Sequence, residues 1–348
     1  MRLSSQASRA SCSRNGRAPC ARVALGGNGW LGGLRLFTAA LTMVLAVTIV
    51  VGCGSEGTPT DTKSSGAAGK TTTVGGIQIA SDPALTEALP DSLKASGVLR
   101  VAMNIPYPPW EMYVSEGSKE VTGLDWDLSG ALAAKLGLEA KALQLPFPGL
   151  IPAVQANKAD VVISALYDSK EREQALDFVD YAYDGGTIVV EKGNPEGITS
   201  LDDLAGKRVA VTTSTSQAIM AAKLQKQFKA DGKPAMDVVQ LPNSSDPLLA
   251  IQAGKAVAGL MNLATGGYAA KTYQNGNAFE IVLDPEAPNG YDPGLVGAGV
   301  AKSNTELRDV LQQALQALID EGTYAKLLDK YGLAASAVES ATVNKALL

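Results

Sequence analysis

Short apolar segments alternate with helical patterns from Val98 to Tyr331, and this alternation limits the fold classes open to the chain. Strands are predicted at residues 98–103, 159–165, 207–213, 238–241 and 257–262. Helices are predicted at residues 125–136, 216–227, 307–318 and 323–331, and the first and third of these place their apolar residues on one face. The pattern predicts an α/β fold with mostly parallel sheets, in which ligands bind at the carboxyl ends of strands.

Two local signals mark the ends of the long C-terminal helix. Ser303 and Glu306 have the spacing of a capping box, in which two side chains satisfy free N–H groups of the first turn. Gly322 follows the last apolar position, and glycine commonly ends helices. We therefore expect Ser303 to cap this helix and Gly322 to stop it.

The first 52 residues have the pattern of an export signal. Residues 1–35 contain six arginines and no acidic residue, and residues 36–51 are apolar apart from three threonines. A basic segment before a short apolar one is typical of a secretory signal peptide, and this apolar run is short for a membrane span. Val50-Val51-Gly52-Cys53 resembles a bacterial lipobox. We expect cleavage and lipid attachment at Cys53; an uncleaved anchor is the alternative.

The charge and the rare residue types exclude several function classes. The formal net charge is −5, and loss of the six N-terminal arginines makes it −11, which argues against a nucleic-acid binder. The chain contains no histidine, so it has no histidine-based catalytic triad, general base or metal site. Cys12 and Cys20 leave with the signal, and Cys53 takes the lipid. We expect no disulfide, metal or cofactor.

The segment between the lipobox and the folded part has two compositions. Residues 54–80 are rich in Gly, Ser and Thr, which predicts a flexible tether to the membrane surface. Residues 80–96 are weakly helical, and we expect them to pack on the outside of the fold that follows.

Motifs of the folded part occur in the order and spacing of a known family. They are Leu99–Asn104, Tyr107–Glu111, Gly123–Leu128, Phe147–Pro152, Ala159–Ser164, Glu171–Phe178, Leu201–Val209 and Thr305–Tyr324. Together they resemble the polar amino-acid-binding family of periplasmic solute-binding proteins, which serve ABC importers. The resemblance implies a type II-like fold of two lobes joined by two hinge strands. Lobe 1 is expected at residues 97–187 and 296–340 and lobe 2 at 188–295, with ligand trapped as they close.

The resemblance also implies where the ligand carboxylate binds. Arg172 stands where the family pairs an arginine with that carboxylate, and a guanidinium fork can do so bidentately. Ser164 and Ala165 lie at the adjoining strand end and are candidate ligand contacts. From the residues alone, a surface arginine in the charged run Lys170–Glu173 is the alternative.

Thr215 and Ser216 form a second candidate anion site, between a predicted strand and a predicted helix. The free N–H groups of a helix N-terminus suit a carboxylate, and the resemblance places these residues where lobe 2 meets the ligand. An ordinary hydroxyl cap is the alternative. Family members usually carry glycine where this chain has Ser214.

Three aromatic residues match positions where the family surrounds the ligand. Tyr107, Trp110 and Phe147 can cover a ligand side chain or attract its ammonium by cation–π interaction. Plain core packing is the alternative, and it weighs equally for Trp110.

The chain departs from the family at three candidate contacts. Asn262 replaces the lobe 2 acid that pairs with the ligand ammonium, Asn104 stands where lobe 1 often has an acid, and Tyr167 replaces a small hydroxyl residue. Asparagine supplies no compensating charge, which favours a ligand with a modified or missing amine. Asp184 or Asp292, both near the predicted hinges, is the alternative source of that charge.

The sequence thus predicts an extracytoplasmic solute-binding lipoprotein, held at the cell membrane through Cys53. We expect a monomer that captures an amino acid or related organic acid and passes it to an ABC permease. A ligand-sensing receptor domain is one rival function. A dehydratase on the same fold is another rival function. It needs a positioned acid or base in the cleft, and it is disfavoured because the chain has no histidine and has Asn104 and Asn262 in place of the usual cleft acids.

Overall fold

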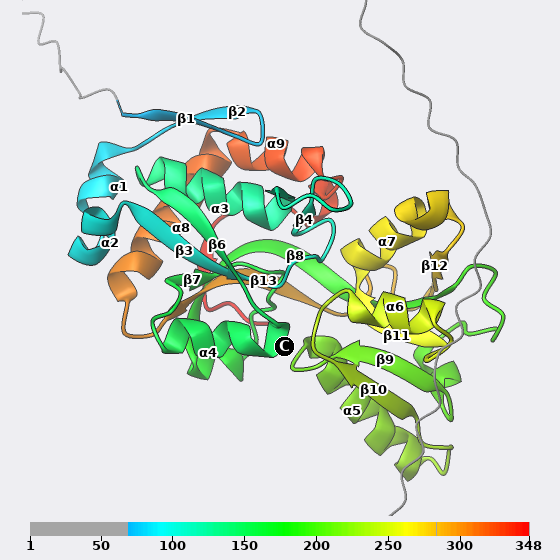
Figure 1. Cartoon of the computed structure of the whole chain (residues 1–348). Coiled ribbons are helices and arrows are strands. Elements are labelled where there is room, and N and C mark those ends of the chain that lie inside the picture. The colour runs from blue at the N-terminus through cyan, green and yellow to red at the C-terminus, as the bar shows by residue number, and fades with distance from the viewer. Residues whose placement is uncertain (1–68, 283, 348) are drawn as a thin grey trace, which may run out of the picture. The chain divides into compact units, whose positions relative to one another are not determined.

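The computed structural model describes residues 69–282 and 284–347. The predicted signal peptide, Cys53 and residues 54–68 of the predicted tether lie outside the described residues. The described part has the expected two-lobed α/β fold (Figure 1). Among its helices, none is both long and apolar enough to cross a lipid bilayer.

Lobe 1 is built on a parallel sheet with helices on both faces. Its strands run in the order β6 (Glu139–Gln144), β3 (Val98–Met103) and β7 (Val161–Val162). Val101 packs toward α3 (Leu124–Lys135), α8 (Thr305–Asp320) and α9 (Thr323–Lys330). Its neighbour Ala102 packs toward α4 (Leu150–Gln155) on the other face. The period of two along β3 therefore explains why this strand is apolar throughout.

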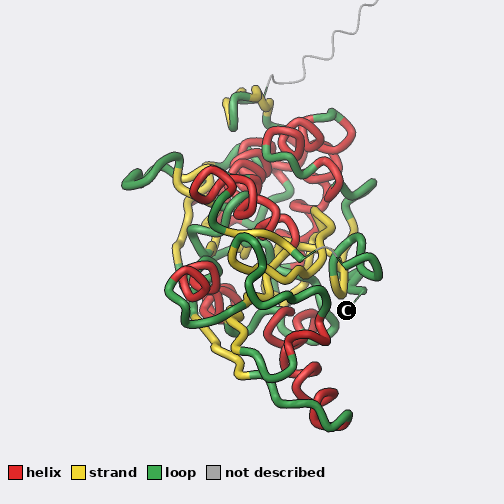
Figure 2. The backbone as a smooth tube through the Cα atoms, turned by 90° about the vertical axis from the view of Figure 1, so that its right-hand side faces the viewer, coloured by secondary structure: helices red, strands yellow, loops and turns green. Residues whose placement is uncertain are grey.

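Lobe 2 repeats the same architecture with different residues. Its parallel strands run in the order β10 (Asp237–Leu241), β9 (Arg208–Thr212) and β11 (Ala258–Asn262). Helix α5 (Ser216–Ala230) packs on Val209 and Val211 of β9, and α6 (Asp246–Gln252) packs on the opposite face. Viewed from the side, helices flank the strands (Figure 2).

Two long antiparallel strands connect the lobes. β8 (Leu176–Glu191) pairs with β11 of lobe 2, β13 (Tyr291–Ala301) pairs with β7 of lobe 1, and the two pair with each other. The sheet order is β10-β9-β11-β8-β13-β7-β3-β6. The prediction of mostly parallel sheets is therefore wrong at the centre, because chain segments that cross between lobes in opposite directions must pair antiparallel. The expected lobe boundaries fall inside these two strands.

Residues 71–80 are not a tether, which corrects the sequence prediction. They form a hairpin of β1 (Thr71–Val74) and β2 (Ile77–Ala80), turning at Gly75 and Gly76, both at positive φ. Two adjacent residues at positive φ are what a tight hairpin turn needs, and glycine supplies them without strain. Ile79 is 2% exposed. The Gly75-Gly76 pair between the apolar residues Val74 and Ile77 is a hairpin signal in the sequence. The Gly- and Thr-rich composition of the segment favoured the tether interpretation instead.

The following lead-in is helical and packed, as predicted. Helices α1 (Pro83–Glu87) and α2 (Asp91–Ser96) bury Leu85 and Leu93 in the core of lobe 1. The remaining elements are β4 (Met112–Tyr113), β5 (Val121–Thr122), α7 (Leu263–Thr272), β12 (Phe279–Ile281) and β14 (Thr342–Val343).

The predicted elements are confirmed in type, with two local corrections. Asn304, and not Ser303, caps α8, because its Oδ1 accepts the N–H of Leu307 at 3.3 Å. The strand expected at 159–165 is confined to Val161–Val162, since the backbone turns at Ala165 with φ +44°. Gly322, also left-handed, separates α8 from α9 as expected.

Candidate functional site

A small closed cavity lies between the lobes, at the carboxyl ends of β9 and β11. Lobe 1 contributes Tyr107, Phe147, Ala165, Tyr167 and Arg172, and lobe 2 contributes Thr212, Thr215, Ser216, Gln217, Ser244, Leu260, Met261 and Asn262. Its volume is about 10 Å³, enough for roughly one water molecule. The structure is therefore a closed form, and the lobes must separate to admit any larger solute.

Arg172 is the cation of this cavity. Its side chain belongs to a short 3₁₀ turn, Arg172–Gln174, and it is 8% exposed. The guanidinium donates to the carbonyl oxygen of Tyr167 at 2.8 Å and to that of Ser214 at 2.7 Å, and it lies 6.0 Å from the ring centre of Phe147. Burial lowers its pKa to about 10, so it remains charged at neutral pH. It is therefore not a surface arginine.

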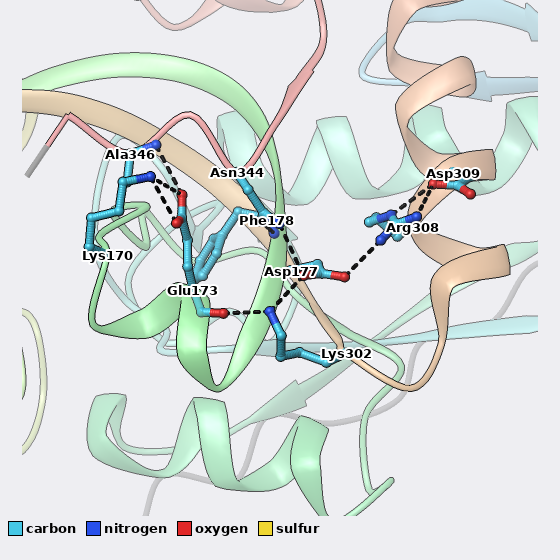
Figure 3. A network of polar contacts seen from close by, with 9 residues as sticks. All are labelled: Lys170, Glu173, Asp177, Phe178, Lys302, Arg308, Asp309, Asn344 and Ala346. Atoms are coloured by element: carbon cyan, nitrogen blue, oxygen red, sulfur yellow. Dashed lines mark hydrogen bonds and ion pairs between the residues drawn. The ribbon is translucent and has the colours of Figure 1, made fainter.

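A polar network anchors the turn that carries Arg172 (Figure 3). The carboxylate of Glu173 accepts from Lys170 at 2.9 Å and from the N–H of Ala346 at 3.2 Å. Lys302 donates to the backbone oxygen of Glu173 and, at 2.9 Å, to Asp177. The adjoining strand β8 and the C-terminal segment are tied into the same network. Arg172 thus projects from a backbone that is held on two sides.

Thr215 is the N-cap of α5. Its hydroxyl donates to the carbonyl of Thr212 at 2.6 Å and accepts the N–H of Ala218 at 3.1 Å, so the ordinary capping role holds for this side chain. The N–H groups of Ser216 and Gln217 lie in the first turn, where an α-helix offers no internal acceptor. Both residues line the cavity, so this helix end presents donors to an anion there. Ser214 has φ +65°, a conformation that favours glycine and explains the family's usual residue.

The aromatic candidates separate into two groups. Tyr107 and Phe147 line the cavity, whereas Trp110 is fully buried in the core of lobe 1, outside the lining. The structure thus favours the packing alternative for Trp110. The hydroxyl of Tyr107 reaches across the cleft and accepts the N–H of Asn262 at 3.3 Å. Tyr167 also lines the cavity, and it narrows the space that a smaller residue would leave open.

Asn104 links the lobes from a position outside the lining. Its Oδ1 accepts the N–H of Ser244 in lobe 2 at 2.7 Å, and its Nδ2 donates to the carbonyl of Leu145 at 2.7 Å. Its own N–H donates to the hydroxyl of Ser164 at 3.0 Å. Asn104 and Ser164 therefore do not line the cavity themselves, and Asn104 holds the lining residue Ser244 through a hydrogen bond in this closed form.

Two buried acids missed as functional residues fix the strand end at Ser164 and Ala165. Glu111 accepts from the Ser164 hydroxyl at 2.5 Å, and Asp125 accepts the N–H of Ala165 at 2.6 Å and the hydroxyl of Tyr181 at 2.8 Å. Burial raises the pKa of Asp125 to about 6, and burial together with the charge of Asp125 raises the pKa of Glu111 well above its usual value. Both acids stand inside motifs that carry the family resemblance, which was the available signal.

Asp184 lies beside the cavity wall, whereas Asp292 is exposed. Asp184 is 6% exposed, and its Oδ1 accepts the N–H groups of Gly185 at 2.9 Å and of Ala264 at 3.4 Å. Burial raises its pKa to about 7. Burial raises the pKa of the Tyr107 and Tyr167 hydroxyls, and the negative charge of Asp184 adds to both shifts, which places the carboxylate near both side chains.

The structure therefore brings most of the predicted contacts together and adds others. Eight predicted residues line one cavity, while Asn104, Trp110 and Ser164 lie outside the lining. Lining residues that the sequence analysis missed are Thr212, Gln217, Ser244, Leu260 and Met261. The described residues contain no cluster of acids suited to holding a metal ion.

A family model decides the identity. Residues 99–334 match the family described as bacterial extracellular solute-binding proteins, family 3. The chain belongs to this family. Its members' role as solute-binding proteins fits a cavity between two lobes, and the resemblance inferred from the motifs is confirmed.

Characterised relatives are amino-acid-binding proteins. The arginine-binding protein ArgT of Corynebacterium glutamicum is 26% identical over 273 residues, covering 77% of this chain and 86% of the relative. The L-arginine-binding protein of Pseudomonas aeruginosa is 28% identical, covering 67% and 87%. The histidine-binding periplasmic protein of Escherichia coli is 26% identical, covering 67% and 86%.

Solved structures agree in fold. The substrate-binding protein of an amino acid ABC transporter is 31% identical with a TM-score of 0.59, covering 67% of this chain and 98% of that chain. An ancestral arginine-binding protein bound to arginine is 32% identical with a TM-score of 0.59, covering 68% and 98%. The ancestral amino acid-binding protein AncCDT-1, a precursor of cyclohexadienyl dehydratase, is 27% identical with a TM-score of 0.59, covering 69% and 97%.

Proposed function

We propose that this protein captures a small amino-acid-like solute with a carboxylate in the cleft between its lobes and delivers it to an ABC importer. The observation that carries the proposal is Arg172, a buried cation on an anchored turn beside the N-terminus of α5. A carboxylate suits both groups, because charge-assisted hydrogen bonds to a guanidinium and to free helix N–H groups reinforce each other.

Contacts between the lobes explain how capture works. Tyr107 meets Asn262 and Asn104 meets Ser244 across the cleft, so the closed form has direct interlobe bonds. A solute that adds contacts to both lobes shifts the population toward closure, and the importer then distinguishes closed from open protein. The names of the relatives, which are amino-acid-binding and ABC-transporter proteins, support this class of solute.

Binding without turnover is part of the proposal. AncCDT-1 is named as a precursor of a dehydratase, so the rival activity has a relative in its favour. The described residues that line the cavity include no acid, and the chain has no histidine. These side chains suit hydrogen bonding to a ligand better than proton transfer. Release of phenylpyruvate from prephenate by the purified protein would overturn this part of the proposal.

The extracytoplasmic position rests on the N-terminal pattern and on the relatives. The histidine-binding relative is named as periplasmic. For this chain we propose lipid attachment at Cys53, which anchors the protein to the membrane. Cells grown with an alkyne-tagged fatty acid should label the wild-type protein. The Cys53→Ser variant should lose the label and be released from the membrane fraction, whereas Cys20→Ser should keep both.

A thermal unfolding screen tests the solute class. Purified protein is heated with each of the common amino acids, with methylated amino acids and with small organic acids. A ligand at about 100 times its Kd adds about 2.7 kcal/mol to the free energy of unfolding, which raises the midpoint by a few degrees. The proposal requires at least one carboxylate-bearing compound to do so. It fails if none of these carboxylate-bearing compounds raises the midpoint.

A further inference from the structure

Buried polar atoms in and beside the cavity lack hydrogen-bond partners. Within residues 69–282 and 284–347, these unpartnered atoms are Oη of Tyr167, Oδ2 of Asp184, Nδ2 of Asn262 and Oγ1 of Thr265. The four residues are 2%, 6%, 4% and 1% exposed. A buried polar atom without a partner costs about 1–3 kcal/mol. Three of the four are oxygens that can accept, so they predict a ligand group that donates hydrogen bonds, whereas Nδ2 of Asn262 is a donor beside Asp184.

These four atoms belong to one neighbourhood. Asn262 and Thr265 flank Ala264, whose N–H donates to the other oxygen of Asp184. Asn262 also donates its backbone N–H to Tyr107, and both line the cavity together with Tyr167. Asp184 lies behind Tyr107 and Tyr167, close enough for its charge to perturb both hydroxyls. Asp184 does not itself line the closed cavity, so its contact with a ligand requires the widening of the cleft that any amino acid needs.

The unpartnered oxygens of Tyr167, Asp184 and Thr265 are suited to an ammonium group. A primary ammonium has three N–H donors, and a carboxylate and two hydroxyls offer three acceptors. Arg172, which lines the same cavity, supplies the opposite charge. One fixed cation and one fixed anion beside the same cavity match the two charges of an amino acid backbone.

The rest of the cavity offers nothing for a second cation. Among the described lining residues none is acidic. Asn104, at the position where relatives of this family often have an acid, already uses its carboxamide on Leu145 and Ser244. Glu111 is engaged with Ser164, and burial favours its neutral form.

We propose that Asp184, on hinge strand β8, pairs with the ligand ammonium in place of the absent lobe 2 acid, and that the ligand is an α-amino acid with an uncharged side chain. The inference rests on the proposed function, since it assumes that Arg172 holds the carboxylate. It selects the hinge alternative over a ligand with a missing amine, and Asn262 becomes a hydrogen-bonding neighbour of the ion pair.

Matched pairs of ligands separate this role from a structural one. The probes are L-alanine with L-lactate, L-leucine with its 2-hydroxy analogue, and L-phenylalanine with phenyllactate, each titrated calorimetrically into full-length protein. Wild-type protein should bind at least one amino acid at least about tenfold more tightly than its hydroxy partner and more tightly than L-arginine. The Asp184→Asn variant should lose about tenfold or more for that amino acid while its affinity for the hydroxy acid changes little.

Asp292→Asn is the matched control, because Asp292 is an exposed acid on the other hinge strand, β13. It should change neither affinity. Equal losses for amino and hydroxy acids in Asp184→Asn, or no loss at all, would overturn the inference. Tighter binding of the hydroxy acids or of L-arginine by the wild-type protein would also overturn the inference. All of these outcomes leave the proposed function intact, because a carboxylate-bearing solute still binds. If none of these acids binds, and methylated amino acids and larger organic acids do not bind either, the proposed function is contradicted as well.

Discussion

The guanidinium of Arg172 in lobe 1 donates to the backbone oxygen of Ser214 in lobe 2 at 2.7 Å. The residue that we propose as the partner of the solute carboxylate therefore also bonds the two lobes in the closed form. Ser214 presents that oxygen from a left-handed backbone conformation, φ +65°, immediately before the N-cap of α5. Closure and carboxylate binding consequently share one side chain.

Replacing Arg172 should remove binding without unfolding the protein. Arg172→Met loses the charge-assisted hydrogen bonds to the solute, each worth about 1.5–3 kcal/mol, so affinity should fall by about 100-fold or more. Arg172→Lys keeps the positive charge but loses the planar guanidinium fork. Its affinity should therefore lie between that of the wild-type protein and that of Arg172→Met. Calorimetric titration measures the affinity. Arg208→Met is the control, because the side chain of Arg208, on β9, forms an exposed ion pair with Asp237 on the neighbouring strand β10. Wild-type affinity in Arg172→Met would show that the carboxylate binds elsewhere.

The buried acids behind Ser164 and Ala165 should respond differently to amide substitution. Asp125→Asn turns one acceptor into a donor facing either Ala165 or Tyr181, and leaves that group unpaired. We expect a loss of about 2–3 kcal/mol in the free energy of unfolding, measured in urea. Glu111→Gln should cost less than about 1 kcal/mol, because burial already favours the neutral form of Glu111. Equal losses in the two variants would contradict this assignment of charge.

Stability should increase as the pH falls from 8 to 5. Burial raises the pKa of Asp168 to about 7, with a further contribution from Asp180, and burial also raises that of Asp184 to about 7. Ionised forms of these acids disfavour the folded state, so between about pH 4 and 7 the folded protein binds more protons than the unfolded chain. The unfolding midpoint should therefore be higher at pH 5 than at pH 8. Asp168→Asn should reduce this difference, and a difference that persists unchanged would exclude Asp168 as a source.

The N-terminal hairpin should contribute to stability through Ile79. Its side chain is 2% exposed in the core of lobe 1, and Ile79→Ala should cost about 2–4 kcal/mol. Gln78 precedes it on the same strand and is exposed, so Gln78→Ala should change stability by less than about 0.5 kcal/mol. Urea unfolding distinguishes the two. Similar small effects would mean that β1 and β2 detach readily from α3.

Local patterns in the sequence determined the elements and the family. Apolar periodicity located β3, α3 and α8, because the residues that bury one face recur at the spacing of the element itself. The ordered motifs identified the family, and Arg172, the proposed carboxylate partner, stands in one of them. The cap of α8 was misplaced by one residue, since Ser303 and Asn304 are both good capping residues.

Only the tertiary structure decided what depends on distant segments. Asp184 and Asn262 are 78 positions apart, yet pairing of β8 with β11 brings them to one cavity wall. Asp292, equally plausible from the sequence, remains exposed. Glu111 and Asp125 bond Ser164 and Ala165, which are 53 and 40 positions away, and Trp110 packs into the core although its motif borders the cleft. Side-chain burial and charge environment arise from packing between strands and lobes, and no local spacing encodes them.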